Sequence, residues 1–251
     1  MRKKVQLTLV RHGQSIWNHE NRFTGWTDVP LTKEGINEAI FAAKLLKESK
    51  IDFDVAYTSI LKRAVQTYNV VCDELNMHHI PLIKSWRLNE RHYGNLTGLN
   101  KAETAEKYGK DTVAGWRRSY DIQPPIMDNK DPRAPYNDSK YIYVSKSALP
   151  LTESLKNTQE RTLPLLYDQI MTDILQEKNV LVIAHANSLR AILKVLDNIN
   201  DKNIQSLYIP TCIPLVYEFC NNSDIISKKY LGDENELKKK IENLIKLGNK
   251  K

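Results

Sequence analysis

Apolar strand patterns alternate with amphipathic helix patterns along this chain, and this alternation limits the possible folds more than any other feature. The strand pattern VQLTLV is followed by a helical pattern at residues 32–48, and FDVAYTS is followed by a second helical pattern after Ser59. Far along the chain, VLVIA leads into an amphipathic helical pattern from about Ser188. Repeated units of this kind predict an α/β fold, a three-layer sandwich with a mostly parallel central sheet and helices on both faces.

A histidine follows two of these strand patterns. His12 comes after VQLTLVR, and His185 comes after VLVIA, directly before a helix start. Because ligands of a parallel sheet bind beyond the carboxyl ends of its strands, we expect both imidazoles at the same edge of the sheet, in one site. Gly13 allows a close approach of the backbone to a ligand, and Ser15 and Asn18 add polar groups. The free N–H groups at the second helix start suit a phosphate.

Several arginines lie at the expected ends of strands and helices, beside aromatic residues and glycines. Arg11 precedes the first histidine, and Arg63 falls in the first turn of the helix predicted after FDVAYTS, where the helix dipole disfavours a cation. The segment WRLNERHYG places Glu90 among basic residues, and WRRSY adds Arg117 and Arg118. We interpret this concentration of guanidinium groups as a site for a small anionic substrate.

These residue types fit phosphoryl transfer through a phosphohistidine on His12. A neutral imidazole is a competent nucleophile near pH 7 when its other nitrogen is held as a donor, for example to a backbone carbonyl. Arg11, Arg63 and His185 would offset the negative charge on the moving group. The sequence contains no carboxylate cluster and no HxH or HExxH spacing, so we predict no metal in the site.

The regular alternation stops between about residues 86 and 150. Five prolines and many polar residues occupy this stretch, with a short helical pattern near residues 101–108. We interpret it as a long lid-like insertion, because a long irregular excursion in a compact domain is usually functional. The lysine-rich end, about residues 233–251, is expected to be a flexible basic tail. Residues 1–251 as a whole are expected to form one catalytic domain.

Composition limits the classes of function. The formal net charge is +7, but eight lysines and only five acidic residues lie from Asn221 onward, as on a solvated surface. Nucleic-acid binding through this end is a distant alternative, because the lysines are not interleaved with aromatic residues. No stretch approaches the roughly 20 apolar residues of a membrane helix, and three cysteines without metal spacing suit a reducing compartment. We therefore expect a cytoplasmic protein that binds neither nucleic acid nor a membrane.

An ordered set of motifs resembles one known family. LVRHGQSIWN, ENRFTGWTDVPLT, YTSILKRA, WRLNERHYGNLTGLNKAETAEKYG, WRRSYDIQPP, LPLTESLKNT, AHANSLR and IPTCIPLVYEF occur in this order from about Leu7 to Leu231. Together they resemble the cofactor-dependent phosphoglycerate mutases of the histidine phosphatase superfamily. The resemblance implies interconversion of 3-phosphoglycerate and 2-phosphoglycerate, primed by 2,3-bisphosphoglycerate without a metal, in a homodimer or homotetramer.

The resemblance also implies a role for each matching residue. His12 would carry the phosphoryl group, and Glu90 would exchange a proton with the substrate hydroxyl. Arg11, Arg63 and His185 would bind and stabilise the moving group. His92 is expected to order its loop rather than to touch substrate, and Ala186 to contribute its main chain only. The residues implied around the substrate are Gly13, Gln14, Ser15, Asn18, Thr24, Gly25, Arg91, His92, Tyr93, Lys101, Arg117, Arg118, Ala186 and Asn187.

Three positions depart from the family pattern, and related activities remain alternatives. Ala186 and Cys212 stand where the family usually has glycine, and Gln14 stands where it has glutamate. The alternatives are a bisphosphoglycerate mutase or phosphatase and a broad-specificity histidine phosphatase. The long insertion argues against an ordinary phosphatase, and Ser15 with the Thr24–Gly25 pair favours the mutase over the synthase-type relatives.

Overall fold

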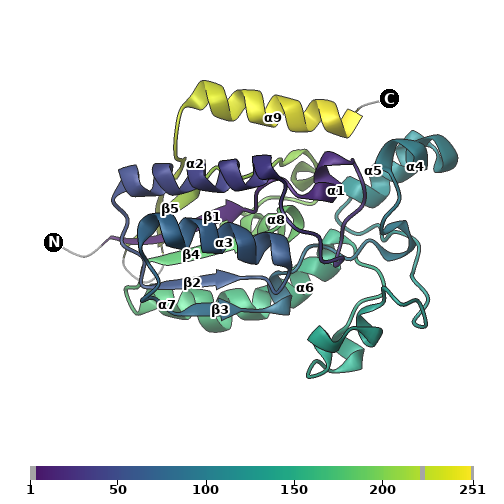
Figure 1. Ribbon diagram of the computed structural model, residues 1–251, viewed down its shortest axis with the longest axis horizontal. Helices are drawn as coiled ribbons and strands as arrows, with labels where there is room; N and C mark the ends of the chain where they lie inside the picture. The colour runs from purple at the N-terminus through teal and green to yellow at the C-terminus, as the bar shows by residue number, and fades with distance from the viewer. Residues whose placement is uncertain (1–3, 221–223, 250–251) are drawn as a thin grey trace.

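The computed structural model describes residues 4–220 and 224–249, which form a six-stranded sheet with helices packed around it (Figure 1). The strands are β1 (Val5–Arg11), β2 (Val55–Thr58), β3 (Leu82–Lys84), β4 (Val180–Ala184), β5 (Leu215–Cys220) and β6 (Asp224–Tyr230). The α-helices are α1 (Ile16–His19), α2 (Lys33–Ser49), α3 (Lys62–Leu75), α4 (Lys101–Tyr108), α5 (Lys110–Arg118), α6 (Leu155–Leu165), α7 (Met171–Leu175), α8 (Ala186–Leu196) and α9 (Glu234–Asn249). Shorter helical turns are η1 (Trp86–Leu88), η2 (Gly94–Leu96), η3 (Pro135–Asn137), η4 (Ser139–Tyr141), η5 (Lys146–Ala148), η6 (Leu166–Ile170) and η7 (Asn203–Ser206).

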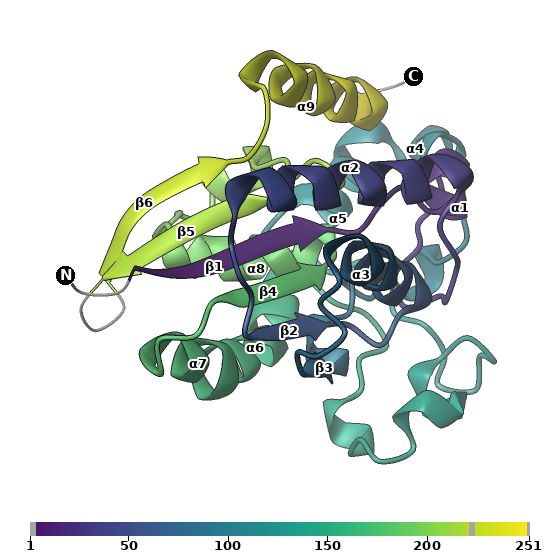
Figure 2. The ribbon, with the colours of Figure 1, turned by 60° about the vertical axis from the view of Figure 1, so that its left-hand side comes forward.

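The sheet has the strand order β3-β2-β4-β1-β5-β6. The first four strands in this order are parallel to one another, and β5 and β6 are antiparallel to their neighbours. The prediction of a mostly parallel sheet is therefore confirmed. Since β1, β4 and β2 are adjacent and parallel, their carboxyl ends lie at one edge of the sheet (Figure 2).

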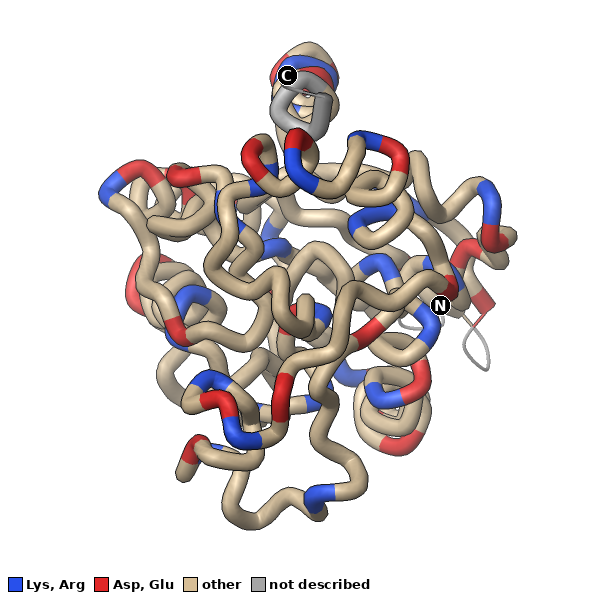
Figure 3. The backbone as a smooth tube through the Cα atoms, turned by 90° about the vertical axis from the view of Figure 1, so that its right-hand side faces the viewer, with Lys and Arg blue, Asp and Glu red and all other residues tan. Residues whose placement is uncertain are grey.

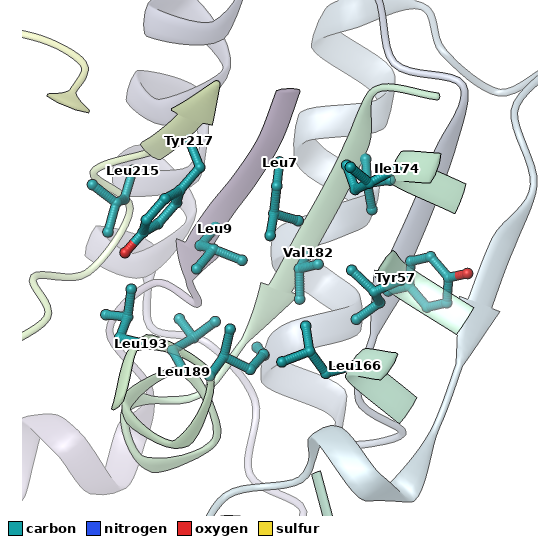
Figure 4. Close-up of a cluster of buried hydrophobic side chains, with 14 of the residues drawn as sticks. Leu7, Leu9, Tyr57, Leu166, Ile174, Val182, Leu189, Leu193, Leu215 and Tyr217 are labelled. Atoms are coloured by element: carbon teal, nitrogen blue, oxygen red, sulfur yellow. The ribbon is translucent and has the colours of Figure 1, made fainter. Parts of the chain in front are cut away.

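Alternating side chains of the central strands pack into two separate cores. On β4, Val180 and Val182 belong to a core with residues of α6, α7 and α8, part of which Figure 4 shows. Leu181 and Ile183 belong to a core with residues of α2 and α3 on the opposite face. Helices thus cover both faces, as predicted, and the apolar residues fix the register of β4, because a slip by one residue would exchange its two faces.

Two helices of the repeated units, α2 and α8, begin at a polar N-cap residue. Thr32 caps α2, because its hydroxyl accepts from the N–H of Gly35 at 3.0 Å. The helix predicted from about Ser188 begins two residues earlier, at Ala186, so His185 is its N-cap residue. Nothing separates the end of β4 from α8 except this histidine.

The insertion and the end of the chain contain more helix than the sequence pattern predicts. Within residues 86–150 lie α4, the unpredicted α5 and several short turns, and part of this segment projects at the lower right of Figure 1. The segment from residue 233, expected to be a flexible tail, contains α9, which lies along the outer side of α2 (Figure 2). There Lys240 Nζ is 5.5 Å from the centroid of the Phe41 ring, and residues 250 and 251 are outside the described part.

Charged segments are mixed on the side of the molecule toward which β1 and β2 point. Figure 3 shows this side, with positive and negative segments interspersed along the chain. Among the described residues, no helix is both long and apolar enough to cross a lipid bilayer.

Candidate active site

The two histidines predicted to converge lie against each other. The ring centroids of His12 and His185 are 4.8 Å apart in an edge-to-face arrangement, and both side chains are buried. The parallel pairing of β1 with β4 brings them together, and the N–H of His12 donates to the carbonyl of Ala184 at 3.0 Å. The expected meeting of two imidazoles at one sheet edge is confirmed.

His12 has the protonation state and tautomer that a nucleophile needs. Nδ1 lies 2.7 Å from the carbonyl oxygen of Gly13, which can only accept, so Nδ1 carries the proton and Nε2 keeps its lone pair. Arg63 Nε donates to this Nε2 at 3.3 Å. Burial, then the charges of Arg63 and Arg11, lower the pKa of His12 well below its ordinary value. The predicted backbone-carbonyl partner is confirmed, and the ring is neutral at physiological pH.

His185 has one ring nitrogen engaged and one unengaged. Its Nε2 lies 2.7 Å from Ser59 Oγ, while its buried Nδ1 has no hydrogen-bond partner among the described residues. Burial and the charge of Arg63 lower its pKa well below the usual range. Ser59, which follows β2, was not predicted as a site residue. Its position could have been inferred from FDVAYTS, because β2 is next to β4 and ends at the same edge.

Two arginines flank the histidines, of which Arg63 is buried and Arg11 is partly buried. Arg63, in the first turn of α3, donates to the carbonyls of Gly25 at 2.8 Å and Thr27 at 3.0 Å, and burial lowers its pKa to about 10. Arg11 donates to the carbonyl of Ile209 at 2.8 Å, while its buried Nε has no partner within the described chain. Their hydrogen bonds to backbone oxygens hold both guanidinium groups in place without neutralising them, so their charge is available to an anion.

Glu90 faces the same cavity from the insertion. One carboxylate oxygen, Oε1, accepts from the N–H of Arg91 at 2.8 Å and from Asn187, whose main-chain N is 3.2 Å away and whose side-chain Nδ2 is 2.6 Å away. Since Asn187 lies in the first turn of α8, Glu90 is joined directly to the helix that follows His185.

The loop that carries Glu90 is held by a buried ion pair that sequence reasoning missed. Arg161 Nε lies 2.6 Å from Glu153 Oε1, and both side chains are under 10% exposed. Arg161 also donates to the carbonyls of Arg87, Asn89 and Glu90. Both residues lie in or beside the motif LPLTESLKNT, but their pairing cannot be inferred from the sequence, because it depends on how α6 packs against the loop.

One cavity unites most of the predicted residues. Its walls contain twelve of them, and seven described residues that were not predicted. The predicted residues in the walls are Arg11, His12, Asn18, Thr24, Arg63, Glu90, Tyr93, Lys101, Arg117, Arg118, Ala186 and Asn187.

 Eleven of the twelve carry polar side chains, and Ala186 is the twelfth. The unpredicted residues in the walls are Asn21, Arg22, Arg190, Leu207, Tyr208, Ile209 and Leu244.

The other predicted residues are not among those that line the cavity, and several of them hydrogen-bond or pack against lining residues. They are Gly13, Gln14, Ser15, Gly25, Arg91, His92 and His185. Ser15 donates from Oγ to Asn18 Oδ1 at 2.9 Å, which leaves the amide nitrogen of Asn18 for the cavity. The side chain of Gln14 accepts from Thr32 Oγ1 at 2.9 Å and therefore turns toward α2. The backbone of Gly13 packs on α2, because a Cβ on Gly13 would lie 2.2 Å from the carbonyl oxygen of Gly35.

Two of these supporting residues act within the insertion. Arg91 donates to the carbonyl of Arg117 and lies with its guanidinium carbon 4.8 Å from the centroid of the Tyr93 ring. His92 Nδ1 accepts from the N–H of Gly94 at 3.1 Å, and burial lowers the pKa of His92 to about 3. His92 is thus bonded within its own loop and stays neutral.

Further cations, contributed by the insertion, line the same cavity. They include Lys101, Arg117 and Arg118. The guanidinium carbon of Arg118 lies 3.8 Å from the centroid of the Tyr208 ring. Burial and the charges of Arg117 and Arg11 lower the pKa of Lys101 to about 7. Cations crowded to this degree lower one another's affinity for protons, and a bound anion reverses that effect.

Ala186 and Cys212, which stand where the resembled family usually has glycine, lie in different surroundings. Ala186 lines the cavity at the start of α8, so its N–H lies at the positive end of the helix dipole. Cys212 is buried and has a φ of 52°, in the left-handed region that favours glycine, while its N–H donates to the carbonyl of Arg11 at 2.9 Å. The strained cysteine is thus bonded to the residue that precedes His12.

Comparison with known proteins gives consistent results. A model of the histidine phosphatase superfamily (branch 1) matches residues 7–228. The chain is 50% identical over 247 residues to a 2,3-bisphosphoglycerate-dependent phosphoglycerate mutase of Treponema denticola, covering 98% of this chain and 100% of that relative. It is 51% identical over 243 residues to a protein of the same name from Borreliella afzelii, covering 97% and 98% of the two chains.

Solved structures with lower identity share the fold. YhfR of Bacillus stearothermophilus has a TM-score of 0.66 at 21% identity, covering 88% of this chain and 95% of its own. A mycobacterial glucosyl-3-phosphoglycerate phosphatase has a TM-score of 0.66 at 20% identity, covering 91% of this chain and 97% of its own. At these identities the likeness establishes the architecture alone.

Proposed function

We propose a function from the premise that this chain belongs to the histidine phosphatase superfamily. The protein interconverts 3-phosphoglycerate and 2-phosphoglycerate through a phosphohistidine primed by 2,3-bisphosphoglycerate. The observation that carries the proposal is a single cavity, lined by one of the paired histidines with Arg11 and Arg63 and also by the insertion cations Lys101, Arg117 and Arg118. A substrate with a phosphate and a carboxylate needs both.

His12 acts as the nucleophile. Its Nε2 attacks the phosphorus, and the N–P bond forms while the bond from phosphorus to the ester oxygen breaks. Arg11, Arg63 and His185 lie around this position and stabilise the negative charge that spreads over the phosphoryl oxygens. Because the guanidinium groups are already fixed by backbone carbonyls, little reorganisation accompanies the transfer.

Glu90 moves the proton. The primed phosphohistidine gives its phosphoryl group to the free hydroxyl of 3-phosphoglycerate, and Glu90 accepts the proton of that hydroxyl. The bisphosphate formed then transfers its other phosphoryl group to His12, and Glu90 protonates the ester oxygen that leaves. Glu90 and His12 both line the cavity. Because the phosphoryl group taken back comes from the other oxygen of the substrate, the result is isomerisation without net transfer to water.

The insertion cations hold the part of the substrate that does not react. Lys101, Arg117 and Arg118 bind the anionic end that does not react, and bound anions keep Lys101 protonated. The residues also fit the bisphosphorylated primer, since the buried Nε of Arg11, Oγ1 of Thr24 and Nδ1 of His185 have no partner among the described residues. These atoms can bond one phosphate of the primer while the insertion cations hold the other.

Exclusion of water from the cavity is part of the proposal, because water hydrolyses phosphohistidine. Leu244 of α9 contributes to the cavity wall, and we propose that this helix and residues 86–150 limit the entry of water. We also propose that the protein works in the cytoplasm as a homodimer or homotetramer, which light scattering of the purified protein would test.

A product assay tests the proposed function directly. The purified protein is incubated with 3-phosphoglycerate, with and without 2,3-bisphosphoglycerate, and 2-phosphoglycerate and free phosphate are measured together. We expect isomerisation that depends on the primer and exceeds phosphate release. Phosphate release in excess of isomerisation would assign a phosphatase instead, and net accumulation of 2,3-bisphosphoglycerate would assign the synthase.

A further inference from the structure

Arg190, in the second turn of α8, is a buried guanidinium in the cavity wall that none of the roles above includes. Its side chain is 2% exposed. It donates to Asn187 Oδ1 at 2.9 Å and to the carbonyl of Ile204 at 2.6 Å, and both acceptors are neutral. Burial and the charges of Arg91 and Arg118 lower its pKa to about 9. A buried cation with neutral partners is costly, so its position requires an explanation.

The bond from Arg190 determines which way the amide of Asn187 faces. A guanidinium can only donate, so the amide atom toward Arg190 is the oxygen. The nitrogen then points the other way, to Glu90 Oε1 at 2.6 Å and to the hydroxyl of Tyr93 at 3.2 Å. A rotated amide would set its N–H groups against Arg190 and its oxygen against the carboxylate, so both contacts would become repulsive.

The orientation of Asn187 in turn makes the two oxygens of Glu90 different. Oε1 accepts three N–H groups, two from Asn187 and one from Arg91. Oε2 receives none of the hydrogen bonds found in the described part of the chain, and Glu90 lines the cavity. An oxygen that already accepts three hydrogen bonds is a poor proton acceptor, whereas the other is free for the substrate.

We propose that Arg190 is a positioning residue that, through Asn187, keeps Oε2 of Glu90 as the oxygen that exchanges the proton with the substrate. This inference rests on the proposed function. In the step concerned, a substrate hydroxyl oxygen bonds to phosphorus while the P–N bond of phosphohistidine breaks. The electron pair of that bond stays on His12 Nε2, and the hydroxyl proton goes to Glu90 Oε2.

Arg190→Met removes the donor and keeps much of the side-chain volume. We expect kcat for isomerisation to fall roughly tenfold or more, since general acid–base catalysis contributes about 10²–10⁴-fold, while KM for 3-phosphoglycerate changes less than about threefold. Arg190→Lys, the matched control, keeps a charged donor and is expected to recover most of the lost rate. A raised KM with unchanged kcat would instead assign Arg190 to substrate binding and overturn the proposal.

An activated phosphoryl donor separates positioning from general damage. With p-nitrophenyl phosphate the leaving phenolate needs no proton, so the burst of p-nitrophenolate that accompanies phosphorylation of His12 should be alike in the wild type and Arg190→Met. An equal loss with this donor would show a merely structural role and reject the inference. In a Glu90→Gln background, Arg190→Met should add little further loss of kcat, because both changes remove one function, and full additivity would contradict it.

A second variant covers the case in which Arg190→Met does not fold. Asn187→Asp keeps an acceptor for Arg190 but replaces the N–H donor to Glu90 with a carboxylate, and it should lower kcat by a similar factor. Wild-type kcat in this variant would reject the proposal. Failure of the wild type itself to isomerise 3-phosphoglycerate would reject the proposed function, whereas an active wild type with an equally active Arg190→Met would reject only the role of Arg190.

Discussion

The cavity has two halves that are held in place by different contacts. The strand-end half consists of His12, His185 and Arg11 at the ends of β1 and β4, with Arg63 at the start of α3. It is fixed by the parallel register of the sheet and by the two cores that this register aligns. The insertion half comprises the cavity residues of the segment 86–150. It has no sheet register. A buried ion pair bonded to loop carbonyls supports the loop that carries Glu90, and only small apolar clusters pack the rest.

The difference shows what each half can tolerate. A position fixed by many apolar contacts changes little when one contact is lost, whereas a position fixed by one charged pair depends on both partners. We therefore expect substitutions in the strand-end half to affect chemistry with little loss of stability. Substitutions that break the support of the insertion half should affect stability and chemistry together.

The largest effect is expected for His12→Ala. Loss of the nucleophile should abolish acid-labile phosphorylation of the protein and reduce isomerisation by at least about 10³-fold, while the fold persists. Labelling with a radioactive phosphoryl donor, followed by acid treatment, measures this. His19→Ala, at an exposed histidine, is the control and should label normally. Label retained on another residue of His12→Ala would contradict the assignment of the nucleophile.

Breaking the ion pair tests the insertion half. Arg161→Met leaves Glu153 buried without its partner, so we expect the free energy of unfolding to fall by about 3–5 kcal/mol, with a lower kcat because Glu90 loses its loop support. Urea denaturation measures the first effect. The double variant Glu153→Gln/Arg161→Met should recover part of the stability. Equal stability of Arg161→Met and the wild type would mean that the halves do not differ in the way described.

The pH dependence of stability gives a smaller contrast. The pKa of His92 falls from 6.5 to about 3 on folding. Above pH 6.5 the imidazole is neutral in both the folded and the unfolded chain, so it does not change the free energy of unfolding. Below pH 6.5 the unfolded chain binds a proton that the folded chain does not. Stability is therefore lost with decreasing pH down to about pH 3, and the part due to His92 between about pH 7 and pH 5 is about 2 kcal/mol. His92→Asn should flatten the curve of unfolding free energy over this range. An unchanged slope would mean that His92 is protonated in the folded state.

The smallest effect is expected for Cys212→Gly, beside the strand-end half. Glycine relieves the left-handed backbone at a φ of 52° but leaves space against Ala39 and Ala42, and the two effects oppose each other. We expect a change of less than about 1 kcal/mol in the free energy of unfolding, with kcat nearly unchanged. Thermal denaturation and the isomerisation assay measure both. A large change in kcat would mean that the hydrogen bond from residue 212 to Arg11 controls the position of that arginine.

The same contrast explains which parts of the molecule could be predicted from the sequence. The strand patterns predicted the edge at which His12 and His185 meet, because parallel strands have only one carboxyl edge. Ser59 could have been found by the same reasoning. Arg161 and Arg190 could not, because their roles depend on which carbonyl or amide a long side chain reaches after packing, and periodicity contains no such information.

Helix α9 shows another limit of the sequence reading. Its charge suggested a flexible tail, yet residues such as Leu237, Ile241 and Leu244 recur at helical spacing. The high lysine content hid this apolar stripe. The position of Leu244 in the cavity wall could not be predicted, because it depends on how α9 lies along α2.

The contact between Gly13 and Gly35 places two backbones against each other with no room for a side chain. A Cβ on Gly35 would lie 2.1 Å from the carbonyl oxygen of Gln14, as one on Gly13 would lie 2.2 Å from that of Gly35. The loop after His12 therefore packs directly on the first turn of α2, a helix with no residue among those that line the cavity. A saturation scan of the gene should consequently find position 35 almost as intolerant of substitution as the histidine itself, and inherited variation there should be read as damage to catalysis.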